Sequence, residues 1–377
     1  MKVTIKMKVM YFIHTLDIGG AETICAQYLM ELKKRNIDVV LVVIAHRNNF
    51  LEDRLKRNGI RIISIYPLKY QSYPCAVLNG IYRRIVSFES WWNKMLDKEQ
   101  PDVIHINTLL DCFSATNFSY NKLIYTFHGC VDRYMNMMSD NGRRKLKYYS
   151  KCGMKFFSLS SEMSEDIRMK LSSDNIVYMP NGLDIAGIRR RRYKRNDFLS
   201  GLGIDADSLV IGHVARFDLV KNQARTVGIF QEVLKRRPDS YLLFVGNIEN
   251  EYGENVKKQV AEAGLDNRIR FLGIRDDATK IMSVLDAVVL PSITESFSLV
   301  MVEAQTHNIR AVASLAVPES VICNNNCFRL SLDDSDEKWA YYITGDFTEK
   351  HSYKLEDFAM DNVVDKLLAE YRKSAAL

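Results

Sequence analysis

The sequence contains few prolines, tryptophans and cysteines. Its 377 residues include only 7 prolines, 3 tryptophans and 7 cysteines. The cysteines are scattered without the spacing of a disulfide framework, and their number is odd. Because the beginning of the chain also lacks a secretory signal pattern, we expect a cytoplasmic protein whose thiols are reduced.

Long apolar runs and low-complexity tracts are also lacking. The apolar run at residues 9–13 is too short to span a membrane, and we expect it to form a first strand. Hydrophobic residues make up 47% of the chain and charged residues 26%, which are values typical of globular proteins. The length suits two domains of ordinary size, each with its own core.

The sequence also offers little to a metal ion or cofactor. Cys323 and Cys327 have no histidine or second cysteine pair nearby, so a metal site there is not expected. Two Asp-x-Asp strings, at residues 205–207 and 334–336, do not follow strands as a metal site would require, and we interpret both as solvated loops. We therefore expect no metal and no cofactor.

Short apolar runs alternate with segments of helical periodicity, as a parallel sheet covered by helices requires. The pattern predicts two consecutive Rossmann-like units joined near residues 181–197, and a helix in the tail at residues 355–372. The predicted strands are residues 9–14, 39–45, 60–65, 103–107, 123–127, 156–160 and 176–178 in the first half, and 209–215, 241–246, 269–272, 287–290 and 310–313 in the second.

Two glutamates flank the start of a predicted helix in the second half. Glu295 lies on the loop that leaves the strand-like run 286–291, and Glu303 lies about one turn into the helical run 299–306. Free amides at a helix N-terminus, with carboxylates on either side, suit a polyhydroxylated ligand. Two glutamates at this spacing occur often by chance, so the interpretation depends on their partners.

Arg216 and Lys221 occupy an equivalent position after another strand of the same half. The run 209–215 predicts a buried parallel strand, and Lys221 precedes a helix with regular apolar spacing. Two cations between a strand end and a helix start form an anion site, for which a diphosphate is the natural occupant. A solvated basic turn is the alternative.

The first half has two further candidates at strand ends. Gly19 and Gly20 lie in a strand-to-helix turn where the backbone can approach a ligand, although the spacing of a dinucleotide fingerprint is missing. His128 follows the predicted strand 123–127, at the sheet edge where open parallel sheets bind ligands. A tight turn and a structural histidine are the respective alternatives.

Four segments together resemble the retaining GT-B glycosyltransferases of family 4, particularly the bacterial capsule and exopolysaccharide enzymes. They are residues 17–22, which resemble the family's glycine loop, residues 179–184 with their Pro-Asn-Gly motif, residues 212–222 and residues 295–303. The segments occur in the family's order and cover nearly the whole chain. Each of them is unspecific by itself, but the combination is specific.

The resemblance implies an α/β fold of GT-B architecture, with two Rossmann-like domains facing each other across a cleft. Residues 1–183 would form the acceptor domain and residues 184–355 the nucleotide-sugar donor domain. The C-terminal helix, at about residues 356–377, would cross back to the amino-terminal domain.

The same resemblance implies a metal-independent glycosyltransferase that moves a sugar from a nucleotide-sugar, by preference a UDP-sugar, to a saccharide or lipid-pyrophosphate-linked acceptor. Fixed cations would stabilise the departing nucleotide diphosphate. The residues implied as catalytic are His128, Arg216, Lys221 and Glu295; those implied in substrate binding are Gly19, Gly20, Asn181, Phe297, Ser298, Leu299 and Glu303.

Within this set, Glu295 would contact the hydroxyl groups of the donor sugar and Glu303 the ribose of the nucleotide. The amides around Phe297, Ser298 and Leu299 would hold the sugar and phosphate. Many relatives have glycine after the first glutamate where this chain has Ser296, which leaves the identity of the donor sugar open. Front-face displacement and double displacement through a glutamate both stay open as mechanisms.

Other functions on the same fold are a sugar-nucleotide epimerase, a phosphorylase and a non-catalytic binding subunit. A phosphorylase should carry a pyridoxal lysine or a site for inorganic phosphate, and the sequence shows neither. A degenerate binding subunit would be expected to have lost some of the four residues Arg216, Lys221, Glu295 and Glu303.

The net charge of +6 is compatible with an acidic partner. Basic residues cluster at 143–155, where aromatic residues are interleaved, and again at 189–195. Such a surface would suit an anionic membrane at the inner face of the cell, where a peripheral enzyme meets a lipid-linked acceptor. A solvated helix face is the alternative, and nucleic acid is not expected because no binding motif occurs.

Overall fold

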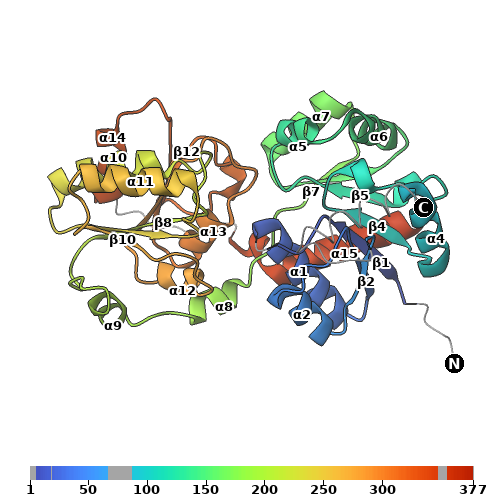
Figure 1. The fold of residues 1–377 in the computed structure, drawn as a ribbon, viewed down its shortest axis with the longest axis horizontal. Coiled ribbons are helices and arrows are strands. Elements are labelled where there is room, and N and C mark those ends of the chain that lie inside the picture. The colour runs from blue at the N-terminus through green and yellow to red at the C-terminus, as the bar shows by residue number, and fades with distance from the viewer. Residues whose placement is uncertain (1–5, 18, 67–86, 347–354, 377) are drawn as a thin grey trace. The chain divides into compact units, whose positions relative to one another are not determined.

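The computed structural model describes residues 6–17, 19–66, 87–346 and 355–376. The chain folds into two compact units (Figure 1). Unit 1 comprises Met1–Gly182 and Asp361–Leu377, and unit 2 comprises Leu183–Met360. These divisions lie close to the domain borders expected from the sequence.

Unit 1 is built on a seven-stranded parallel sheet in the order β3-β2-β1-β4-β5-β6-β7. Helices cover both faces, with α1 and α2 on one side and α5, α6 and α7 on the other (Figure 1). The strands are β1 (Lys8–Ile13), β2 (Asp38–Val43), β3 (Arg61–Ser64), β4 (Val103–Ile106), β5 (Leu123–Thr126), β6 (Lys155–Ser158) and β7 (Ile176–Tyr178). The helices are α1 (Gly20–Lys34), α2 (Phe50–Arg57), α4 (Phe88–Glu99), α5 (Val131–Met137), α6 (Asp140–Lys151), α7 (Ser161–Leu171) and α15 (Met360–Ala376), with 3-10 turns at Leu110–Cys112 and Tyr120–Lys122.

The C-terminal helix α15 is fixed in unit 1 by buried hydrogen bonds. The Tyr371 hydroxyl lies 2.5 Å from that of Tyr11 on β1 and 2.6 Å from Nδ1 of His105 on β4. Nε2 of His105 in turn lies 2.8 Å from the Thr126 hydroxyl on β5. Lys155 and Glu370 add an ion pair of 2.8 Å, and both side chains are about nine-tenths buried. Strands β1, β4 and β6 therefore hold α15 directly, and β5 supports it through His105, by polar atoms that would be costly to leave unpaired.

Unit 2 is built on a six-stranded parallel sheet in the order β10-β9-β8-β11-β12-β13. Helices α10, α11 and α14 pack together on one side, and α8, α12 and α13 on the other (Figure 1). The strands are β8 (Val210–Val214), β9 (Tyr241–Val245), β10 (Ile269–Phe271), β11 (Ala287–Leu290), β12 (Arg310–Ser314) and β13 (Cys327–Leu330). The helices are α8 (Ile185–Arg190), α9 (Arg195–Ser200), α10 (Gln223–Arg236), α11 (Glu251–Glu262), α12 (Ala278–Met282), α13 (Leu299–Thr306) and α14 (Asp336–Thr344), with 3-10 turns at Glu319–Val321 and Leu355–Phe358.

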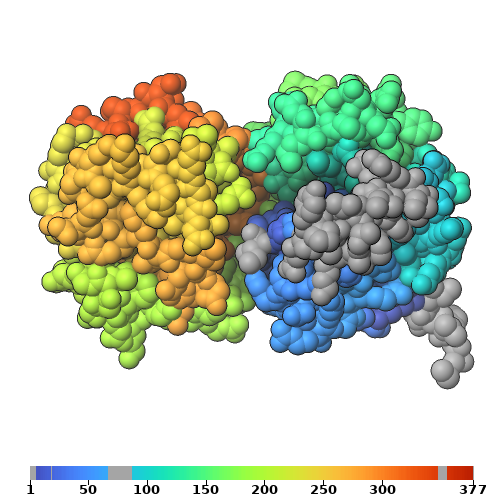
Figure 2. All heavy atoms as spheres, in the orientation of Figure 1, coloured from blue at the N-terminus to red at the C-terminus, as the bar shows by residue number. Residues whose placement is uncertain are grey.

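The central strands of both sheets are buried on both faces, which explains their continuous apolar sequences. In unit 2 the core lies between the sheet and the helices α10, α11 and α14, and it includes Phe230, Phe244 and Trp339. In the space-filling view the atoms of α11, yellow to orange, form a large part of the visible surface of this unit (Figure 2).

The α/β class with two Rossmann-like units is confirmed, and every predicted strand is present with ends shifted by up to two residues. The strand β13 was missed. Only Cys327 and Leu330 of its four residues are buried, because the strand lies at an edge of its sheet. The interpretation of residues 334–336 as a loop holds for Asp334 and for Ser335, which caps the start of α14, but not for Asp336, the first residue of that helix.

The basic part of the surface expected at residues 143–155 is exposed, since Arg144, Lys147 and Lys151 lie on the outside of α6, but most of its aromatic part is not. Phe156 and Phe157 are core residues of β6, Tyr149 is buried, and Lys155 is buried with Glu370. Helical and strand segments follow each other closely here, so residues that are neighbours in sequence point into the core as well as outward. Tyr148, with 55% of its surface exposed, does lie on the outside.

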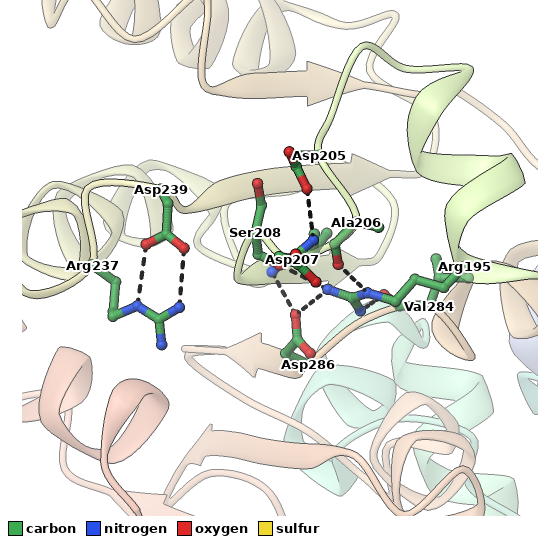
Figure 3. A network of polar contacts seen from close by, with 10 residues as sticks. Arg195, Asp205, Ala206, Asp207, Ser208, Arg237, Asp239, Val284 and Asp286 are labelled. Atoms are coloured by element: carbon green, nitrogen blue, oxygen red, sulfur yellow. Dashed lines mark hydrogen bonds and ion pairs between the residues drawn. The ribbon is translucent and has the colours of Figure 1, made fainter.

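Arg195, the last residue of the second basic cluster, is also structural. Its guanidinium donates to the carbonyl oxygens of Ala206 at 2.9 Å and Ser208 at 2.7 Å, to that of Val284, and to the Asp286 carboxylate at 2.8 Å (Figure 3). These partners precede β8 and β11, so Arg195 attaches α9 to the amino ends of two strands. Open parallel sheets bind ligands at the opposite, carboxyl ends of their strands.

None of the helices in the described part of the chain combines the length and the apolar character that crossing a membrane requires.

Candidate active site

The candidate residues of unit 2 lie on two loops that leave neighbouring strands. One loop connects β8 to α10, the other connects β11 to α13, and β8 and β11 are adjacent in the sheet. The loops are joined directly, since the Ile293 amide donates to the Val220 carbonyl oxygen at 2.8 Å. Residues 73 or more positions apart in sequence are thereby brought to one edge of the sheet, as the positions of the motifs predicted.

Lys221 and Glu295 form an ion pair at this edge. The Lys221 Nζ lies 2.6 Å from Glu295 Oε1, and the Ser292 hydroxyl donates to the same oxygen at 2.9 Å. The Glu295 side chain is only 7% exposed, whereas that of Lys221 is 30% exposed. The carboxylate is therefore fixed from the protein side, and the ammonium group retains access to solvent.

Arg216 lies on the same loop as Lys221 but is much more exposed. Its side chain is 66% exposed and donates to Asp218 at 3.0 Å. The loop itself is held by the buried Gln223, whose Nε2 donates to the Arg216 carbonyl oxygen at 3.0 Å. Asp218, Gln223 and Ser292 were not singled out from the sequence, and their only signal was a position close to a predicted strand end.

A glycine permits the close packing of β8 and β9 beside this loop. Gly246 follows β9 with φ of 151°, and a Cβ atom there would lie 1.9 Å from the carbonyl oxygen of Ala215. No side chain fits such a contact, so glycine is required where the two chain segments approach each other.

The start of α13 contains three predicted binding residues in different surroundings. Phe297 is buried, and its ring packs edge-on against Phe358 with 5.6 Å between ring centroids. Ser298 precedes the helix in the left-handed conformation, with φ of 78°, and makes no side-chain cap. Leu299 is the first helical residue, so the amides that follow Ser298 are the unpaired donors of a helix N-terminus.

Glu303 lies in the second turn of α13, and burial raises the pKa of its carboxyl group to about 7. The Thr279 hydroxyl on α12, which donates to Glu303 Oε1 at 3.3 Å, and the charge of Arg191 only partly oppose this effect. A half-buried carboxyl group whose pKa is raised toward neutral pH is characteristic of functional sites.

His128 of unit 1 follows β5, at the carboxyl edge of its sheet. Its Nε2 lies 2.8 Å from Asn107 Oδ1, just beyond β4, and 3.8 Å from the Cys25 sulfur on α1. Burial lowers the pKa of the His128 imidazole to about 4, so the ring is neutral at physiological pH. The sequence analysis did not single out Asn107 or Cys25.

The glycine turn and the Pro-Asn-Gly motif also lie in unit 1. Gly19 precedes α1 and Gly20 is its first residue, while Ile18 lies outside the described residues. Tyr28 on α1 holds the motif: its hydroxyl accepts from the Gly182 amide at 2.8 Å and donates to the Pro180 carbonyl oxygen at 3.3 Å. Asn181 between them is buried.

Over the described ranges, no three His, Cys, Asp or Glu side chains are arranged so that they could hold a metal ion.

Two families cover most of the chain between them. Residues 18–186 match Glycosyltransferase Family 4, and residues 194–344 match Glycosyl transferases group 1. The chain belongs to the glycosyltransferases of family 4. Membership accounts for the four sequence segments and for the two parallel sheets, and confirms the family predicted from the sequence.

Curated relatives of this family member include glycosyltransferases of three bacteria. The capsular polysaccharide biosynthesis glycosyltransferase CapH of Staphylococcus aureus is 23% identical over 82% of this chain and 81% of its own. The Escherichia coli UDP-Gal:alpha-D-GlcNAc-diphosphoundecaprenol alpha-1,3-galactosyltransferase is 25% identical over 64% of this chain and 66% of its own. The putative glycosyltransferase EpsF of Bacillus subtilis is 29% identical, over 46% of this chain and 45% of its own length.

Solved structures share the fold over almost the whole chain. A glycosyltransferase from Rickettsia africae has a TM-score of 0.76 at 17% identity, with 98% of both chains covered. Anabaena Alr3699/HepE in complex with UDP and glucose has a TM-score of 0.71 at 18% identity, with 98% of this chain and all of that chain covered.

Proposed function

We propose that this family 4 glycosyltransferase transfers a sugar from a UDP-sugar to a saccharide or lipid-linked acceptor in polysaccharide assembly, with retention of configuration and without a metal ion. The observation that carries the proposal is the Lys221–Glu295 pair at the carboxyl edge of the unit 2 sheet, with the N-termini of α10 and α13 beside it. UDP as the nucleotide is supported by the complex of the similar Anabaena protein.

Transfer breaks the bond between the anomeric carbon and the diphosphate, so negative charge grows on the leaving group. Lys221, which remains accessible to solvent, and the exposed Arg216 would stabilise that charge. The amides of residues 298 and 299 at the start of α13 would bind phosphate or sugar oxygens. Fixed protein cations in this role make a divalent metal unnecessary.

The two glutamates would orient the donor. Glu295, held in place by Lys221 and Ser292, would accept hydrogen bonds from sugar hydroxyls. Glu303, in the second turn of α13, would accept a hydrogen bond from a ribose hydroxyl. Because ribose hydroxyls donate to an ionised carboxylate, UDP should lower the pKa of Glu303 when it binds.

In unit 1, Gly19, Gly20, Asn181 and His128 would meet the acceptor and the reacting sugar. His128 is neutral, so its role would be orientation of hydroxyl groups and not donation of positive charge. A lipid-linked acceptor is supported by the name of the similar Escherichia coli enzyme, whose acceptor carries diphosphoundecaprenol. Exposed residues of the 189–192 arginine run would suit an anionic membrane surface.

The test is calorimetric binding of UDP, GDP and a panel of UDP-sugars to wild type in the presence of EDTA, followed by transfer assays with lipid-linked and free saccharides. Micromolar binding of UDP and transfer of one sugar with retained configuration are expected. Absence of UDP binding, or activity that EDTA abolishes, would contradict the proposal.

A further inference from the structure

The hydrogen bonds around Asn107 determine how its side-chain amide is oriented. Its Nδ2 lies 3.2 Å from the carbonyl oxygen of His105, and its Oδ1 lies 2.8 Å from Nε2 of His128. The reverse orientation would place Oδ1 against a carbonyl oxygen, where two acceptors repel each other. Because Asn107 is buried, water cannot relieve that repulsion. The oxygen therefore faces His128.

An oxygen that faces the ring fixes the position of the imidazole proton. Oδ1 can only accept, so Nε2 of His128 must carry the hydrogen and donate it. A neutral imidazole with hydrogen on Nε2 has a lone pair on Nδ1. A ligand hydroxyl that meets the ring at Nδ1 must then donate its hydrogen to the ring.

The backbone of Asn107 is held as firmly as its amide. Its N–H donates to the Phe12 carbonyl oxygen at 2.8 Å, which ties the end of β4 to β1. His105, whose carbonyl oxygen receives the amide, is itself fixed by Tyr371 and Thr126. Asn107 thus connects His128 to the buried hydrogen-bond network of the sheet.

Other described neighbours of His128 place no positive or negative charge of their own against the ring. The Cys25 thiol lies 3.8 Å from Nε2, and burial raises its pKa, so it stays protonated. The Tyr134 hydroxyl interacts with the His128 backbone, and burial raises its pKa to about 12. His105 is kept neutral by burial, and Glu22 acts on Cys25 and Tyr134 through its charge.

We propose that Asn107 is a positioning residue that holds His128 as the Nε2–H tautomer, so that the ring meets sugar hydroxyls as a hydrogen-bond acceptor at Nδ1. The proposal rests on the proposed sugar transfer for its consequence, but the tautomer exists in the free protein. An imidazole in this tautomer is neither a general acid nor a cationic contact at Nδ1, because a protonated Nδ1 could not accept a hydrogen bond.

The tautomer is read by long-range ¹H–¹⁵N correlation spectra of the imidazole rings in the full-length protein at neutral pH, without substrate. The chain has seven histidines, so the His128 signal is assigned by its loss in His128→Gln. We expect a pyridine-like Nδ1 and a pyrrole-like Nε2. The pattern should persist in Cys25→Ala, which removes the contact of the same nitrogen with sulfur, and change in Asn107→Leu. A hydrogen on Nδ1 in wild type, or an unchanged pattern in Asn107→Leu, would overturn the proposal.

The consequence for transfer is tested with Asn107→Asp. A carboxylate facing Nε2 raises the pKa of His128, and the protonated ring can no longer accept at Nδ1. In wild type, protonation of His128 should not lower kcat between about pH 5 and 8. In Asn107→Asp, kcat should fall as the pH drops through the raised pKa of His128. Asn107→Leu should lower kcat about tenfold with little change in acceptor KM, which corresponds to one hydrogen bond.

Equal pH profiles for wild type and Asn107→Asp, together with an unchanged kcat in Asn107→Leu, would overturn the positioning role. If wild type transfers no sugar at all, the proposed function fails instead, and the spectra still decide the tautomer.

Discussion

The two units place their candidate residues at the same edge of the same kind of sheet but give them opposite electrostatic surroundings. In unit 2 a charged pair, Lys221 and Glu295, is only partly buried and lies beside the exposed Arg216. In unit 1 His128 is kept neutral and is held by an amide and a thiol. A parallel sheet edge therefore does not determine the chemistry of a site, which depends on the side chains that follow the strands.

The difference suits the proposed division of work. A diphosphate that gains charge during the proposed reaction needs cations, and Lys221 and Arg216 of unit 2 would supply them. Sugar and acceptor hydroxyls carry no charge, and neutral acceptors and donors such as those in unit 1 can orient them. Four further experiments test this comparison.

The largest effect is expected when the unit 2 cation is removed. Lys221→Ala should lower kcat by a factor of about 10²–10³, the usual result of deleting a group that stabilises transition-state charge. It should also lower the free energy of unfolding by about 1–3 kcal/mol, because the almost buried Glu295 would keep the Ser292 hydroxyl but lose its cation. Single-turnover kinetics and urea denaturation measure the two effects.

Arg216→Ala is the matched control for stability. Because the Arg216 side chain is 66% exposed, its loss should change the unfolding free energy by no more than about 0.5 kcal/mol while transfer still slows. Near-normal turnover in both variants would contradict the view that unit 2 provides the charge stabilisation.

Glu303 offers the next test, because desolvation of its carboxylate should lower the free energy of unfolding while the same group would bind UDP. Its pKa of about 7, against an ordinary 4.5, means that at pH above 7 the folded protein holds an ionised carboxylate in an unfavourable site. Glu303→Gln should therefore raise the unfolding free energy by up to about 3 kcal/mol at about pH 8. The gain should shrink as the pH falls through 7 and vanish below about 4.5, where the carboxyl group is protonated in both states.

The same variant should weaken UDP binding by a factor of about 10–100, because it replaces a charged acceptor of ribose hydroxyls. In wild type the UDP affinity should fall as the pH drops below 7, since protonation removes that acceptor. Calorimetry at several pH values measures both effects. A pH-independent affinity in wild type, or UDP binding unchanged in Glu303→Gln, would exclude a ribose contact.

The sequence predicted the fold well because parallel strands buried on both faces have continuous apolar sequences, as in β8 and β11. It also located Lys221 and Glu295, which lie on the loops that leave these two strands. Side-chain partners were not predictable in the same way: Gln223 and Thr279 act through contacts that only the packed helices create. Asn107 had a usable signal, since it ends the predicted strand 103–107, but many polar residues follow strands without any role.

Tyr371→Phe tests how much the buried hydrogen bonds among Tyr11, His105 and Tyr371 stabilise unit 1, for comparison with the charged pair of unit 2. Removing one hydroxyl leaves Tyr11 and His105 without a shared partner in a buried site. The unfolding free energy should fall by about 1–3 kcal/mol. Tyr341→Phe, at a residue that is 48% exposed on unit 2, is the control and should be nearly neutral. Equal stability of Tyr371→Phe and wild type in denaturation would show that the network contributes little.

The smallest effect is expected at Ser298, where unit 2 holds a strained backbone next to its charged pair. A residue other than glycine with φ of 78° costs about 1 kcal/mol or more. The Ser298 hydroxyl adds to this cost, because it is buried and finds no hydrogen-bond partner in the described part of the chain. Ser298→Gly removes both penalties and should raise the unfolding free energy by about 1 kcal/mol, whereas Ser298→Ala removes only the hydroxyl and should raise it less. Thermal denaturation of the two variants separates the contributions. A loss of stability in Ser298→Gly would mean that the backbone at Ser298 is not strained. The conformation at the start of α13 would then be stabilised by the serine side chain.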